Sequence, residues 1–114
     1  MHELSVTSYL VDAVDTRARE LGATRVLTIN LVIGERSGIV DDSLRFYFEM
    51  LAPGTLVEGA ALNVARTSLR FHCAACARDY GPSGFDFLCP NCGALGEVVD
   101  DGSDLLIESL EIET

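Results

Sequence analysis

Four cysteines in two Cys-x-x-Cys pairs place the strongest constraint on how this chain can fold. Cys73 and Cys76 form the first pair, Cys89 and Cys92 form the second, and twelve residues separate the pairs. Two such turns that face each other supply four thiolates at tetrahedral angles, which is the arrangement that zinc prefers. We therefore expect a closed, structural zinc site that helps to stabilise a chain with a small core.

Other interpretations of the cysteines fit less well. A redox dithiol needs only one pair, and two disulfides need an oxidising compartment. A zinc ribbon that binds nucleic acid needs a basic surface, whereas Asp79 and Asp86 outweigh Arg78 between the pairs. His72 precedes Cys73 and could replace one thiolate. With four cysteines available, we expect it to be an ordinary histidine at the end of a strand.

The charge and composition narrow the class of protein. The chain has 18 Asp and Glu against 8 Lys and Arg, a formal net charge of −10, and 48% hydrophobic residues. Nucleic-acid affinity comes largely from basic side chains, so the charge disfavours a nucleic-acid partner. The hydrophobic content excludes a disordered chain. No apolar run could span a bilayer and no secretory signal is evident, so we expect a cytoplasmic protein without a membrane partner.

Hydrophobic periodicity predicts the elements that flank the cysteines. Residues 4–21 read as a helix and residues 43–51 as a second one, with Asp41, Asp42 or Ser43 as its N-cap. Residues 25–33, 56–71 and 105–112 read as strands. The apolar stripe expected on the first helix consists of Val6, Leu10, Ala13, Val14, Ala18 and Leu21. The inner face expected on the first strand consists of Leu27, Ile29, Leu31 and Ile33, with Val26 and Val32 on the other face.

This order of elements predicts an α+β fold. Two helices pack on a small three-stranded mixed sheet, and the cysteine segment projects as a zinc lobe with four cysteine ligands. Residues 1–70 plus 100–114 are expected to form one domain, and residues 71–99 a zinc-binding lobe inserted between strands.

The first three residues, MHE, suggest a second metal site. The N-terminal amine, the amide nitrogen of His2 and the imidazole of His2 can bind one metal in adjacent chelate rings. Nitrogen donors in a plane suit Ni(II) or Cu(II). Glu3 could add an oxygen, a backbone nitrogen or a hydrogen bond to a ligand. Histidine at position 2 also occurs by chance, so this pattern alone leaves an idle terminus open.

Several stretches together resemble one known family. MHELS at the start, the strand ending IGERSG, the helix LRFYFEM and the two CxxC pairs look like the HypA/HybF family, accessory proteins that deliver nickel during [NiFe] hydrogenase maturation. The resemblance covers nearly the whole chain. It implies a nickel site at Met1, His2 and Glu3, and a zinc site at the four cysteines. Some members use a further histidine or aspartate near the nickel. Asp41 and Asp42 lie where such a carboxylate could come from, and the remaining nickel ligand stays open.

The sequence therefore predicts a nickel metallochaperone rather than an enzyme. Zn(II) is structural and Ni(II) is the transferable cargo. The resemblance implies the GTPase HypB and the hydrogenase large subunit as partners, and the chain is expected to be a monomer or a homodimer. One alternative is a zinc-ribbon adaptor with an idle N-terminus. A small metal-dependent enzyme is the other, but it would need an open coordination position, which four cysteines disfavour.

Overall fold

The computed structural model describes residues 3–114 and contains two helices and six strands in that range. The elements follow the chain in the order α1 (Glu3–Glu20), β1 (Arg25–Gly34), α2 (Asp41–Leu51), β2 (Ala61–Thr67), β3 (Arg70–Cys73), β4 (Arg78–Tyr80), β5 (Glu97–Asp100) and β6 (Leu105–Glu113). The molecule is elongated, with principal extents of 54 × 27 × 16 Å. Neither helix combines the length and apolar character needed to cross a bilayer.

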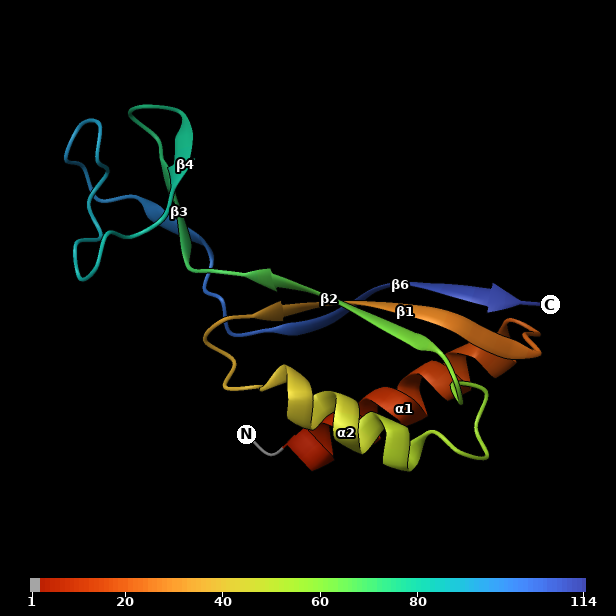
Figure 1. The fold of residues 1–114 in the computed structure, drawn as a ribbon. Helices are drawn as coiled ribbons and strands as arrows, with labels where there is room; N and C mark the ends of the chain where they lie inside the picture. The colour runs from red at the N-terminus through yellow and green to blue at the C-terminus, as the bar shows by residue number, and fades with distance from the viewer. Residues whose placement is uncertain (1–2) are drawn as a thin grey trace.

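The larger of two sheets, here called the main sheet, has the strand order β2-β1-β6. Strand β1 runs parallel to β2 and antiparallel to β6, and α2 supplies the crossover that a parallel pair requires. Both helices lie on the same side of this sheet (Figure 1), and α1 packs against α2. The predicted α+β class is confirmed. Residues 3–67 and 105–114 are called the main lobe below.

The core of the main lobe lies between the two helices and β1. Helix α1 contributes a stripe at three- and four-residue steps, which consists of Thr7, Leu10, Val11, Val14 and Ala18. The predicted stripe omitted Thr7 and Val11, which are buried, and it included Leu21, which is 47% exposed. Val6 and Ala13 of the predicted stripe are only partly buried. Leu21 follows the last residue of the helix, so the helical period no longer directs its side chain into the core.

The alternation of β1 breaks at Leu27. Val26 pairs with Ile112 and Thr28 with Glu111, so the register skips Leu27. This bulge turns Val26 into the core, where it is 1% exposed, and leaves Leu27 only partly buried. The predicted inner face is therefore wrong at this end of the strand, because one unpaired residue reverses the alternation.

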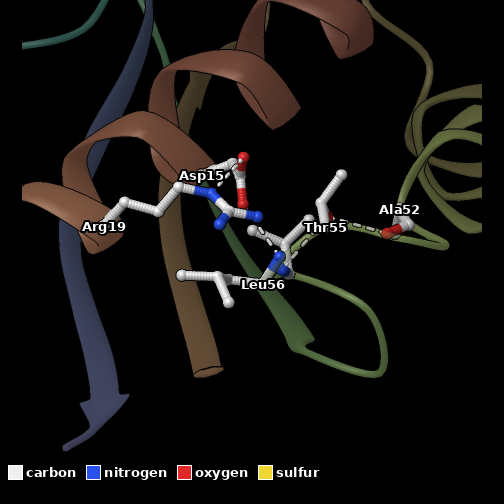
Figure 2. A network of polar contacts seen from close by, with 6 residues as sticks. Asp15, Arg19, Ala52, Thr55 and Leu56 are labelled. Carbon is white, nitrogen blue, oxygen red and sulfur yellow. Dashed lines mark hydrogen bonds and ion pairs between the residues drawn. The ribbon is translucent and has the colours of Figure 1, made fainter. Parts of the chain in front are cut away.

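The strand region predicted over residues 56–71 contains β2 and the start of β3, but it is not one continuous strand and does not begin at residue 56. Residues 52–60 form turns and bends, β2 follows, and β3 then begins in a different sheet. The Leu56 N–H donates to Asp15 Oδ1 at 2.8 Å, and the Leu56 carbonyl accepts from the Val26 N–H at 2.8 Å. Figure 2 shows Asp15 of α1 reaching this turn. These tertiary contacts use the backbone groups that a strand ladder would need.

Helix α2 begins at Asp41, and its N-cap is Val40 without a side-chain capping bond. None of the three predicted capping residues therefore occupies the cap. Asp41 and Asp42 instead lie in the first turn, where carboxylates interact favourably with the helix dipole. Asp41 forms an ion pair with Arg66 of β2, and that guanidinium also donates to the Ile39 carbonyl at 2.8 Å. Arg66 thus fixes the approach to the helix.

Residues 70–100, called the cysteine lobe below, carry the second sheet, with strand order β4-β3-β5. The lobe projects from the end of the main sheet at which β2 leads into β3 and β5 leads into β6 (Figure 1). Its small core contains Phe71 stacked on Tyr80 with ring centroids 5.3 Å apart, and Phe87 packs on Phe71 at 5.9 Å. The predicted projection of the cysteine segment is confirmed.

The IGERSG segment of the main lobe makes a close backbone contact with residues 101–104, which link the cysteine lobe to β6. The Gly34 N–H donates to the Asp104 carbonyl and the Arg36 N–H to the Gly102 carbonyl, both at 2.7 Å. A Cβ on Gly34 would overlap the carbonyl of Gly102, so only glycine fits there without a backbone shift. The Arg36 guanidinium adds a bond of 3.0 Å to the Asp101 carbonyl.

Candidate metal centre

The four cysteine sulfurs converge in the cysteine lobe. All four Sγ atoms lie within 4.8 Å of one another, with Cys73 Sγ 3.5 Å from Cys92 Sγ and Cys76 Sγ 3.9 Å from Cys89 Sγ. A zinc–sulfur tetrahedron with bonds of about 2.3 Å has edges of about 3.8 Å. These distances are too long for disulfides, in which sulfurs lie about 2.05 Å apart. The donor set therefore has the size and chemistry of a tetrahedral thiolate site.

Each pair sits in a tight turn of the same construction. The Ala77 N–H donates to the Cys73 carbonyl at 2.8 Å, and the Gly93 N–H donates to the Cys89 carbonyl at 2.8 Å. The residue after each pair has a positive φ, 56° at Ala77 and 76° at Gly93. Alanine has a steric cost in this conformation. Both cysteine pairs therefore adopt the same turn, which directs their two sulfurs to one side. The first pair adopts it although Ala77 disfavours a positive φ.

Tyr80 holds the two flanks of the second pair together. Its hydroxyl donates to the Phe87 carbonyl at 2.8 Å and accepts from the Gly96 N–H at 2.9 Å. Asn91 lies inside the second pair, and its side-chain amide donates to Cys76 Sγ at 3.2 Å. Such a donor stabilises a thiolate. Sequence reasoning missed both residues, although Asn91 could have been found from its position between two ligating cysteines.

Hydrogen bonds distribute negative charge unequally over the second pair. The backbone N–H groups of Cys92 and Asn91 lower the pKa of Cys89 to about 7. The Ala94 N–H lowers the pKa of Cys92, but hydrogen bonds shared with the Cys76 and Cys73 sulfurs outweigh it and raise that pKa to about 12. Four thiolates in this space repel one another, so full ionisation calls for a cation among them.

His72 lies beside the cluster in sequence but engages another group. Its Nδ1 is 2.7 Å from Asp79 Oδ1, across the β3–β4 pairing. The cluster of potential metal ligands found within residues 3–114 consists of the four cysteines alone. This arrangement fits the expectation of an ordinary histidine at the end of a strand.

The predicted nickel site falls mostly outside the described range. Met1 and His2 lie outside the described residues, and Glu3 is the first residue of α1. The backbone carbonyl of Glu3 accepts a hydrogen bond from the Thr7 hydroxyl at 2.6 Å. This bond does not use the Glu3 carboxylate. Of Asp41 and Asp42, the two possible sources of a further carboxylate ligand, Asp41 forms an ion pair with Arg66. Sequence reasoning missed Arg66, because nothing in its local sequence signals a partner 25 residues away.

Comparison with known proteins gives one consistent result. Residues 1–112 match the family described as "Hydrogenase/urease nickel incorporation, metallochaperone, hypA". Hydrogenase maturation factor HypA of Caldanaerobacter subterraneus subsp. tengcongensis is 40% identical over 114 residues, which cover 99% of this chain and 100% of the relative. The corresponding factor of Geobacter metallireducens is 39% identical over 113 residues, with 99% and 100% covered.

Solved structures resemble the whole chain as well. The solution structure of the Ni metallochaperone HypA from Helicobacter pylori has a TM-score of 0.67 and 27% identity, covering 99% of this chain and 98% of that one. A second solution structure, of a HypA protein, has a TM-score of 0.71 and 26% identity, with 98% and 96% covered. Together with the match over residues 1–112, these likenesses show that the chain belongs to the HypA family of hydrogenase maturation factors.

Proposed function

We propose that this protein binds Ni(II) at its N-terminal segment and delivers it during maturation of [NiFe] hydrogenase. One observation carries the proposal. All four cysteines meet in one cluster in the cysteine lobe, and the ring of His72 is hydrogen bonded to Asp79 in the same lobe. The chain has two histidines, so His2 is the imidazole that remains for an exchangeable site. Family membership supports nickel as the metal.

The proposed nickel ligands come from Met1, His2 and Glu3. The amine of Met1 and the amide and imidazole nitrogens of His2 form a planar set that suits Ni(II). Glu3 stands at the start of α1, and its carboxylate could complete or support that set. The ion at such a site can be passed on by ligand exchange, which a cargo requires.

The proposed role of Zn(II) is structural. Cys73, Cys76, Cys89 and Cys92 would hold it, and the bound ion would supply the positive charge that keeps all four sulfurs ionised. On this proposal residues 71–99 are a zinc-binding lobe inserted into a nickel-binding domain formed by residues 1–70 and 100–114. The sulfur-only set leaves no position for substrate, in keeping with a carrier rather than an enzyme.

The proposed partners are the GTPase HypB and the hydrogenase large subunit, and the proposed location is the cytoplasm. The name of the family supports a role in hydrogenase maturation. A carrier needs one partner that supplies or controls the metal and one that accepts it, and these two proteins fit those roles.

Nickel titration of the untagged, zinc-loaded protein tests the proposal, read by calorimetry and by the absorption band of planar Ni(II). We expect His2→Ala to weaken nickel binding by at least about 100-fold, the scale on which metal sites respond to lost ligands or their supports. His72→Ala is the matched control, because it removes the other imidazole, and it should bind nickel as the wild type does. An N-terminal extension should act like His2→Ala. Equal nickel affinity in all four proteins would contradict the proposal and leave a zinc-only adaptor.

A further inference from the structure

The cysteine lobe and the main sheet together form an open groove of about 430 Å³, and none of its lining residues is a proposed metal ligand. Its floor contains Val32 of β1 and Leu106 of β6, which face each other in the main-sheet register. Val32 lies between Leu31 and Ile33, which are buried under the helices, so it points to the opposite side of the sheet. The groove therefore lies on the side that carries no helix (Figure 1).

Strand β5 of the cysteine lobe forms the other apolar wall. Val98 and Val99 line the groove, and each is 55% exposed, while Leu106 is 57% exposed. Strand β5 is an edge strand of its sheet, so one row of its backbone groups is unpaired within the sheet. Exposed aliphatic side chains beside a free strand edge form a surface that an extended segment can cover.

The apolar part of this surface is local. Two residues before Val32, Asn30 begins a row of polar side chains across the same face. Asn63 Nδ2 donates to Asn30 Oδ1 and Asn30 Nδ2 donates to Ser109 Oγ, both at 3.0 Å. A row of polar side chains that bond one another therefore crosses the open face beside Val32 and bounds the apolar patch of the groove on that side.

The end of the groove nearest the junction of the lobes is acidic. Asp100, Asp101 and Asp104 line it, and the lining includes no lysine or arginine. Asp100 and Asp101 each accept a bond from a backbone N–H two residues on. The Asp104 carboxylate has no hydrogen bond or ion pair to any other residue described. Its charge is therefore available to a ligand.

Two arginines lie near the acidic end. Arg36 donates to the backbone carbonyl of Asp101. The hydrogen bonds from Ser103, to which the charge of Arg36 adds, lower the pKa of the Asp101 carboxyl. Arg70 lies opposite Asp100 in the β3–β5 pairing, but its guanidinium lies beside Gly81, on the far side of β3 from β5. The net negative potential of a chain with charge −10 adds to that of the three carboxylates.

We propose that this groove binds an extended segment of a partner protein in which aliphatic residues lie next to lysine or arginine. The aliphatic residues would cover Val32, Val98 and Leu106, and the basic residues would meet Asp104 and its neighbours. Charge complementarity selects this occupant, since the same carboxylates repel phosphate and so disfavour nucleic acid and anionic lipid. None of the residues that line the groove is a proposed metal ligand, and the proposal does not depend on nickel binding.

Three labelled peptides test the proposal on the zinc-loaded, full-length protein. One has three valines followed by three lysines, the second has serines in place of the valines, and the third has glutamates in place of the lysines. Fluorescence anisotropy measures affinity, and amide chemical shifts locate the site. We expect the valine–lysine peptide to bind most tightly and to shift the amides of Val32, Val98 and Leu106. The other two peptides should bind at least about tenfold more weakly, since each lacks one kind of contact.

Paired variants separate the groove from the general acidity of the chain. Leu106→Gln should lower the affinity for the valine–lysine peptide by about tenfold. This is the loss expected when one leucine no longer buries apolar surface against the peptide. Met50→Gln is its control, because Met50 is exposed to a similar degree (54%) on α2. Asp104→Asn should weaken binding about threefold at low salt, with the effect fading at high salt. Asp12→Asn on α1 is its control and should leave affinity unchanged.

Four results would overturn the proposal. Equal binding of the serine–lysine peptide would mean diffuse attraction to an acidic surface. Unperturbed groove amides would place any binding elsewhere, and wild-type affinity in Leu106→Gln would exclude the apolar floor. Sedimentation that shows a dimer in the wild type and a monomer in Leu106→Gln would assign the groove to a second copy of the chain instead.

Discussion

The two lobes contain very different amounts of apolar core. Fourteen hydrophobic residues are buried in the main lobe, whereas the cysteine lobe buries four, of which two are cysteines. A segment of about 30 residues with so little core falls below the size that folds by burial alone, which is about 40 residues. The comparison teaches that one lobe is held by packing and the other needs a cross-link through its sulfurs.

The polar contacts follow the same division. In the main lobe they connect elements that already pack, as when Asp15 of α1 holds the turn at Leu56. In the cysteine lobe they surround the sulfurs, as when Tyr80 joins Phe87 to Gly96 across the second pair. The polar contacts of the main lobe therefore add stability to a packed core, whereas those of the cysteine lobe position the cysteine sulfurs.

Removal of the proposed zinc should have the largest effect. A structural zinc contributes on the order of 10 kcal/mol to folding, and the core of the cysteine lobe, with four buried residues, is too small to replace it. We expect Cys73→Ala, or chelation at mildly acidic pH, to unfold residues 70–100 while the main lobe keeps its fold. Amide chemical shifts of the two lobes measure this directly. Loss of structure in both lobes at once would show that the main lobe depends on the metal, and an unchanged cysteine lobe would refute a structural zinc.

The reciprocal change is a cavity in the main lobe. Ile29 is 0% exposed and packs in the core of that lobe, so Ile29→Ala should cost about 2–5 kcal/mol. The thermal unfolding temperature should fall, yet the zinc content of the folded protein should stay at one per chain. Val98→Ala, at an exposed position, is the control and should change little. Loss of zinc in Ile29→Ala at temperatures where the main lobe is folded would contradict the separation of the lobes.

Tyr80→Phe should have a smaller effect, confined to the cysteine lobe. The change deletes the hydroxyl that donates to Phe87 and accepts from Gly96, while the ring stays stacked on Phe71. Leaving those two partly buried backbone groups unpaired should cost about 1–3 kcal/mol. Competition with a chromogenic chelator should show weaker zinc binding, with the unfolding of the main lobe unaltered. Wild-type zinc affinity would mean that Tyr80 does not position the second pair.

The sequence predicts the two-lobe character better than the details of either lobe. Paired cysteines at fixed spacing are a local signal, and all four sulfurs do meet. Helical and strand periodicity is also a local signal, because each period is contained within one segment. It therefore predicts the α+β class correctly. The family resemblance drawn from MHELS, IGERSG and LRFYFEM is confirmed by the match over residues 1–112.

Apart from the stripe of α1, the errors arise where distant residues decide the local structure. A bulge at Leu27 depends on pairing with β6, about 80 residues later in the chain. The break in the strand predicted over residues 56–71 depends on Asp15, and the start of α2 on Arg66. Similarly, the need for glycine at position 34 is explained by the close contact of Gly34 with the Gly102 carbonyl. In each case the two contacting residues lie too far apart in the sequence for a local pattern to include both.

The smallest expected effect tests a polar contact that joins two elements of the main lobe. The Asp15 carboxylate accepts from Arg19 Nε at 3.0 Å and from the Leu56 N–H at 2.8 Å (Figure 2). The side-chain hydrogen bond from Arg19, followed by the backbone N–H of Leu56, lowers the pKa of Asp15 below its usual 3.8. Asp15→Asn keeps an acceptor for Leu56 but loses the charge, so it should cost about 1 kcal/mol at neutral pH.

The sign of the pH dependence follows from the lowered pKa of Asp15. The unfolded chain takes up the proton at a higher pH than the folded chain, so the stabilisation is complete above about pH 4 and is lost as the pH falls through the folded pKa. Urea unfolding of the main lobe should therefore separate wild type from Asp15→Asn at pH 7 and bring them together at low pH. Asp12→Asn, one turn earlier on α1 and outside this network, should track the wild type throughout. A constant gap at all pH values would show that the carboxylate charge contributes nothing and that the geometry of the turn alone matters.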